Sequence, residues 1–163
     1  MSTPEGIRLA DTIRQKVAEL KRLCEGLSEE TASRAPEGRW TPKEIVSHLC
    51  GPEGVGLLSS LRLILEKDTP RLDIEGANPY FTGKRTQMTL SKLLDEFEKE
   101  YNQIADFVSG LSEEQLSRKA HIPVFKETPM GEYPTLAIFV GALAGHHMEF
   151  HINHMKEILQ ALA

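Results

Sequence analysis

Four long stretches of this chain repeat apolar residues at steps of three and four. Such steps put the apolar side chains on one side of an α-helix, so each stretch predicts an amphipathic helix. The segments between them contain proline and glycine and lack the alternating pattern of strands. Amphipathic helices bury their apolar sides against one another, and the sequence therefore predicts an all-α four-helix bundle with short additional helices and long loops. The first stretch carries Ile7, Ala10, Ile13, Val17, Leu20 and Leu23.

Capping residues mark where the four helices should begin. Thr3-Pro4, Thr41-Pro42 and Pro134-Thr135 open the first, second and fourth helices, and Thr89 caps the third, which runs to about residue 111. Gly51-Pro52 is expected to kink the second helix before it continues to about residue 64. Long loops are expected at residues 68–88 and 121–133, with a short hairpin as an alternative in either.

A five-residue motif occurs twice. Gly-Leu-Ser-Glu-Glu stands at 26–30 and again at 110–114, and Ser-Arg follows each copy at the same distance. The two copies are 84 residues apart (110 minus 26). Each is expected to end a long helix and to open a short one, with its serine as the N-cap. The chain therefore has two similar halves, which favours a bundle of two helical hairpins over a solenoid.

Length and charge limit the class of protein. The chain has 163 residues and a formal net charge of -5, which predicts one domain over residues 1–163 and disfavours contact with nucleic acid. No apolar run is long enough to span a membrane, and no basic segment with an apolar core precedes the first helix, so a cytoplasmic protein is expected. Cys24 and Cys50 form no C-x-x-C motif and are interpreted as packing residues.

The histidines are the candidate site. His147 and His151 are four residues apart, so both rings can face one point on the helix surface. They continue an apolar stripe formed by Leu136, Val140 and Leu143, where a neutral imidazole needs a hydrogen-bond partner or a metal. A single inward histidine is more often an ordinary core residue, and that alternative stays open for each of them.

A third histidine strengthens the metal interpretation. His48 lies on the inward side of the second helix, so three imidazoles from two helices can surround one ion and leave positions for water or substrate. Residue type alone fits zinc, nickel, copper or iron(II). His154 lies about 10 Å along the axis from His147, too far to share an ion with it, although His151 with His154 is a rival pair. His146 and His121 are expected at the surface or in a loop, and Glu149 is expected to face solvent.

Two motifs resemble those of the DinB-like superfamily. They are Arg39-Trp40-Thr41-Pro42-Lys43-Glu44-Ile45-Val46-Ser47-His48-Leu49 and the later His147-x-x-x-His151, and the resemblance spans nearly the whole chain. It implies a four-helix bundle, one divalent metal ion per chain, zinc or nickel, held by His48, His147 and His151, and a homodimer. Some members transfer low-molecular-weight thiols to electrophiles. One departure is His154-Met155, which stands where members commonly have Gln-Ile.

The function expected from these observations is metal-dependent chemistry. The ion would activate a thiol or water nucleophile, as in a low-molecular-weight thiol S-transferase or a hydrolase, with a small-molecule thiol or electrophile as partner. No catalytic residue beyond the three ligands can be named. The alternatives are a non-catalytic, metal-stabilised dimeric bundle and an interaction module without metal. Loop length alone suggests that the substrate pocket is lined by Tyr80, Phe81, Lys84 and Arg85.

Overall fold

The computed structural model describes residues 2–163, and within that range it is helical without a β-strand. The all-α four-helix bundle predicted from the sequence is confirmed. Two isolated backbone bridges, Arg71 with His121 and Lys119 with Thr135, join the loops. In chain order the elements are α1 (Pro4–Leu23), α2 (Glu29–Ala32), α3 (Pro42–Cys50), α4 (Leu58–Glu66), η1 (Gly83–Gln87), α5 (Leu90–Ser109), α6 (Glu113–Leu116), η2 (Pro123–Phe125), α7 (Leu136–Gly141), η3 (Ala142–His147) and α8 (Met148–Leu162).

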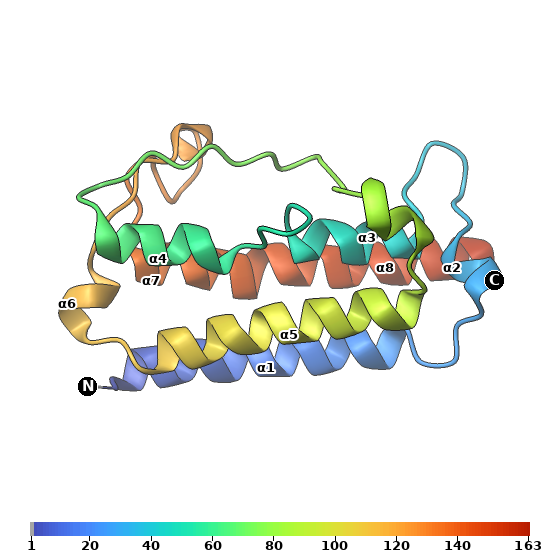
Figure 1. The fold of residues 1–163 in the computed structure, drawn as a ribbon, viewed down its shortest axis with the longest axis horizontal. Coiled ribbons are helices and arrows are strands. Elements are labelled where there is room, and N and C mark those ends of the chain that lie inside the picture. The colour runs from blue at the N-terminus through green and yellow to red at the C-terminus, as the bar shows by residue number, and fades with distance from the viewer. Residues whose placement is uncertain (1) are drawn as a thin grey trace.

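Consecutive long helices of the bundle are antiparallel but lie diagonally across it, so the two helical hairpins expected from the sequence are not the packing units. α1 and the α3–α4 pair run in opposite directions, and so do α5 and the continuous run α7–η3–α8 (Figure 1). The segment after α4 returns along the bundle before α5 begins, so α5 runs in the same direction as α3 and α4. α1 packs along α5, and α3 packs against both α5 and α8. The internal repeat thus corresponds to two halves of similar helix order, but each long helix packs mainly against helices of the other half, so the prediction of two hairpins was wrong.

The predicted N-caps are present. The side chains of Thr3, Thr41, Thr89 and Thr135 each accept a hydrogen bond from a backbone N–H in the first turn of the helix that follows. In the repeated motif, Ser28 caps α2 and Ser112 caps α6 in the same way. These short-range contacts fix where the chain enters each helix.

The second predicted helix is interrupted rather than kinked. α3 ends at Cys50, Gly51 adopts a left-handed φ of 76°, and α4 begins only at Leu58. No side chain of the preceding residues caps α4. Instead the carboxylate of Glu100 on α5 accepts hydrogen bonds from the backbone N–H groups of Leu57 and Leu58, at 2.6 and 2.9 Å. A partner 42 residues away therefore determines where the helix resumes.

The register of the last helix also differs from the prediction. Residues Ala142–His147 form a π-helical segment, which has more residues per turn than an α-helix. The buried stripe continues from Val140 through Ala144 and Met148, while Leu143 and His147 are only half-buried. The π segment therefore rotates Leu143 and His147 out of the core, toward the side where α3 lies.

No helix of the described residues is long and apolar enough to cross a membrane.

Candidate metal centre

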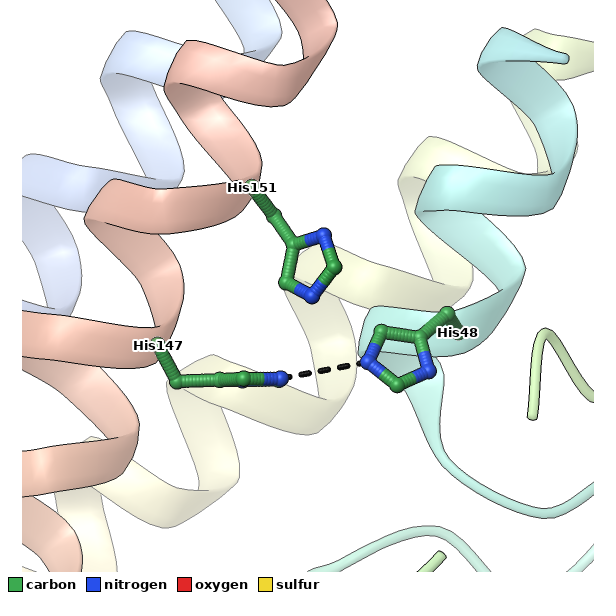
Figure 2. Close-up of side chains that lie close together, drawn as sticks. All are labelled: His48, His147 and His151. Carbon is green, nitrogen blue, oxygen red and sulfur yellow. Dashed lines mark hydrogen bonds between the residues drawn. The ribbon is translucent and has the colours of Figure 1, made fainter. Parts of the chain in front are cut away.

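Three histidines from two parts of the bundle meet at one point. His48 is in the last turn of α3, His147 ends η3, and His151 lies one turn further on α8. One ring nitrogen from each lies within 4.8 Å of those of the other two. Figure 2 shows the three rings pointing toward one another from the facing helices. These three side chains could therefore hold a metal ion, and they are the three that the sequence predicts as ligands.

The ring orientation of His48 is fixed by the crossover segment. Its Nδ1 lies 2.7 Å from the backbone oxygen of Asn78, which can only accept a hydrogen bond. Nδ1 of His48 is therefore the protonated nitrogen, and Nε2 carries the lone pair. A histidine that donates from one nitrogen to a backbone carbonyl is the usual form of a metal ligand.

A local network holds the Asn78 carbonyl in place. The side chain of Asn78 accepts a hydrogen bond from the Tyr80 backbone N–H at 2.8 Å and donates to the carboxylate of Glu75 at 2.6 Å. The Tyr80 hydroxyl donates to the Glu75 backbone oxygen at 3.3 Å. Tyr80 has a φ of 51°, a conformation that a residue with a large side chain rarely adopts. The tyrosine ring lies parallel to that of His48, with centroids 6.2 Å apart.

His147 forms a hydrogen bond with His48 that a metal ion would replace. The two Nε2 atoms are 3.1 Å apart. Since Nε2 of His48 carries the lone pair, Nε2 of His147 is the donor. Nδ1 of His147 is buried and has no hydrogen-bond partner. Binding of an ion through Nε2 would move the proton of this ring to Nδ1, so His147 is the one of the three whose tautomer is not prepared in advance.

The rings of Trp40, His154 and Phe150 also lie against His151. Its Nδ1 lies 3.3 Å from Nδ1 of His154, and the indole of Trp40 stacks parallel to its ring with centroids 6.3 Å apart. Trp40 also contacts the rings of His48 and His154, at centroid distances of 5.2 and 5.8 Å. Trp40 thus packs against the rings of three histidines.

All three histidines are held in the neutral form that binds metals. Burial lowers the pKa of His48 below its ordinary value of 6.5, although the Asn78 carbonyl opposes this change. Burial, followed by the neighbouring histidines, lowers the pKa of His147 to about 4 and that of His151 to about 2. At neutral pH the three rings are already uncharged, so an ion can bind without first displacing a bound proton from an imidazolium.

The histidines open into a large pocket. It has a volume of about 620 Å³ and lies between the α3–α4 side, the α7–α8 side and the crossover segment. This size is within the range of small-molecule sites. Its walls are mainly apolar and include Leu57, Leu61, Ile74, Phe125, Met130, Phe139, Leu143 and Phe150.

The crossover segment lines the pocket differently from the prediction. Ile74–Ala77 and Tyr80 form that wall, whereas Phe81, Lys84 and Arg85 do not. Arg85 is buried, with 1% of its surface exposed, because its guanidinium donates to the backbone oxygens of Ser47, Gly51 and Tyr80 and pairs with Glu96 at 2.8 Å. Lys84 is exposed. The prediction was thus right for Tyr80 and wrong for the other three.

The remaining candidates have ordinary structural roles. Burial raises the pKa of the Cys24 and Cys50 thiols to about 12, so neither is a nucleophile at neutral pH. Glu149 forms an ion pair with Lys16 on α1 instead of facing solvent alone. His146 is exposed at the pocket edge, and His121 forms an ion pair with Glu132 in the loops.

Two contacts of the site have no direct signal in the amino-acid sequence. Trp40 is part of the motif quoted above, but its position before a cap residue does not reveal that it stacks on His151. Asn78-Pro79 indicates a turn. Its contact with His48, 30 residues earlier, depends on the path of the crossover segment.

Comparisons with known proteins identify the family of this chain and structures of the same fold. A family model described as the DinB superfamily matches residues 12–156. YfiT from Bacillus subtilis, described as a probable metal-dependent hydrolase with an unusual four-helix bundle topology, has a TM-score of 0.77 and 19% identity, covering 99% of this chain and 90% of that chain. A protein from Streptococcus pneumoniae has a TM-score of 0.61 and 16% identity, covering 97% of this chain and 93% of the other. At these identities the two structures show similarity of fold alone. No curated protein matches the sequence.

Proposed function

Because this chain belongs to the DinB superfamily and brings three neutral imidazoles together at the base of a pocket, we propose that it is a metal-dependent hydrolase. In this proposal His48, His147 and His151 bind one divalent ion per chain, zinc or nickel. The observation that carries it is the convergence of their ring nitrogens within 4.8 Å of one another. An ion held by three imidazoles with an open position supplies Lewis acidity, which lowers the pKa of a water or thiol and polarises a carbonyl.

The surrounding residues prepare the site for this role. The Asn78 carbonyl keeps the lone pair of His48 directed at the other two rings, and Trp40 packs against the rings of the histidines. The apolar walls hold the organic part of a substrate beside them. Water is proposed as the nucleophile because YfiT is described as a probable metal-dependent hydrolase and because the pocket offers no cluster of cations for an acidic thiol.

Removal and return of the metal tests the proposal. We expect the chelator-treated protein to lose hydrolysis of neutral aryl and alkyl esters and to regain it when one equivalent of zinc or nickel is added. Ester turnover without metal, or none with any divalent ion, would contradict it. Turnover of an electrophile that needs both the metal and an added low-molecular-weight thiol would identify thiol transfer instead.

The non-catalytic alternative makes a different prediction for the same samples. A purely structural ion would raise the melting temperature without any turnover.

The homodimer expected from the family resemblance remains a prediction, and light scattering on these samples measures it.

His154 is proposed to position His151. If Nδ1 of His151 donates to Nδ1 of His154, at 3.3 Å, the lone pair of His151 stays on Nε2, the nitrogen available to an ion. We expect His154→Leu to weaken zinc binding about 10–100-fold, as loss of an outer partner typically does, and His154→Gln to retain most of the affinity because its amide oxygen can accept the same proton. Competition with a chromogenic chelator measures the affinity.

A second readout separates this positioning role from simple packing. In the metal-free wild-type protein, the nitrogen chemical shifts of the His151 ring should show the Nδ1-protonated tautomer. In metal-free His154→Leu they should show a mixture of the two tautomers. An unchanged tautomer and unchanged zinc affinity in His154→Leu would refute the role.

A further inference from the structure

The pocket extends well beyond the three histidines, along the side where α4 faces α7. Phe139 stands eight residues before His147 in the same helical run (147 minus 139), which places it on the order of 10 Å along the axis. Leu57 and Leu61 form the opposite wall, and Phe125 and Met130 belong to the loop that closes this end. A molecule with one end at the histidines would therefore have its body surrounded by apolar side chains.

Charge is nearly absent from this lining. Apart from histidines, the only side chains among the described pocket-lining residues that carry a charge at neutral pH are Arg39 and Glu75. Arg39 pairs with Glu157 at 3.5 Å, and the Glu75 carboxylate accepts the hydrogen bond of the Asn78 side chain at 2.6 Å. The pocket thus offers no cluster of cationic side chains to a carboxylate or phosphate.

These walls favour one chemical class of ligand. A charged group placed against the apolar walls, away from the histidines, loses its hydration without compensation, whereas an apolar body gains by leaving water. We propose that the pocket binds an uncharged, mainly apolar organic molecule of drug-like size, with a single polar group placed at the histidines. Only the identification of this molecule as a substrate rests on the proposed function, because its binding to the apolar walls requires no metal.

Two fluorescent probes with nearly the same rings test this selectivity. N-phenyl-1-naphthylamine is neutral, and 8-anilinonaphthalene-1-sulfonate adds one negative charge to the same skeleton. Titrated into the full-length protein, with and without zinc, the neutral probe should bind at one site per chain and at least about tenfold more tightly than the anionic one. Equal affinity for the two probes, or tighter binding of the anionic one, would overturn the proposal.

Substitutions locate the binding. Leu143→Asp places a charge in the pocket wall and should weaken binding of the neutral probe at least about tenfold. Ile138→Asp is the matched control, because Ile138 lies on the same helical run, is 48% exposed and does not line the pocket. Phe150→Ser is a second pocket variant that should fold normally, since Phe150 is 62% exposed, and it should also weaken binding. Binding unaffected by both pocket variants, or weakened equally by the control, would refute the site.

The two proposals fail in distinguishable ways. Neutral-probe binding that obeys these expectations in a protein that retains no metal would support the pocket assignment and reject the metal-dependent hydrolase. Metal-dependent ester hydrolysis without selective binding of the neutral probe would support the metal-dependent hydrolase and reject the pocket assignment.

Discussion

Purified protein with His48, His147 or His151 replaced by alanine is expected to carry almost no metal, while the wild type carries close to one ion per chain. Each substitution leaves two imidazoles of three, and no other histidine or acidic side chain of the described residues takes part in the cluster. The affinity for zinc should fall by more than about 100-fold. Removing a residue that only hydrogen-bonds to a metal ligand already weakens binding by up to about 100-fold, and removing a ligand itself should cost more. Elemental analysis after gel filtration, on samples first reconstituted with zinc, measures the ratio.

His146→Ala is the matched control for this experiment. His146 is next to His147 in the chain but is exposed, and it does not belong to the cluster. It should retain the ion. Thermal stability gives a second measurement, since free zinc at about 100 times the wild-type dissociation constant should add about 2.7 kcal/mol to the wild type and less than about 0.5 kcal/mol to the three alanine variants. An alanine variant that keeps a full equivalent of zinc would show that the ion binds elsewhere.

The second large effect is expected at Arg85, whose guanidinium joins the crossover segment to α3. Arg85→Met removes the hydrogen bonds to the Ser47 and Gly51 carbonyls and the ion pair with Glu96. Breaking a buried pair and leaving buried acceptors without a donor costs about 3 kcal/mol here, because Glu96 is 37% exposed and can be partly rehydrated. Urea denaturation should show this decrease in the free energy of unfolding, with a melting temperature about 6–12 °C lower.

Lys84→Met provides the comparison for Arg85→Met. Lys84 precedes Arg85 in the same short helix η1, but it is exposed, its backbone N–H donates to Glu53, and its side chain makes no hydrogen bond or ion pair with any described residue. Its replacement should change the stability by less than about 0.5 kcal/mol. Equal effects of the two substitutions would mean that the buried contacts of Arg85 contribute nothing to stability.

The sequence by itself determined the features that depend on neighbouring residues. Apolar steps of three and four specified the helices, and the threonine and serine caps fixed where they begin, because a cap bonds to a backbone N–H only two or three residues away. The repeated motif specified two halves of similar helix order, but not which helices pack together. The four-residue spacing of His147 and His151 was enough to place both rings on one side of a helix.

Only the tertiary structure decided what depends on contacts between distant segments. The π segment, the break after Gly51 and the burial of Arg85 each involve packing or hydrogen bonds that residue spacing does not encode. The same holds for the contact of Asn78 with His48 and for the stacking of Trp40 on His151. Periodicity reports which side of a helix is apolar, but the free energy of a buried polar group depends on its partner. That partner is brought into place only when the bundle forms.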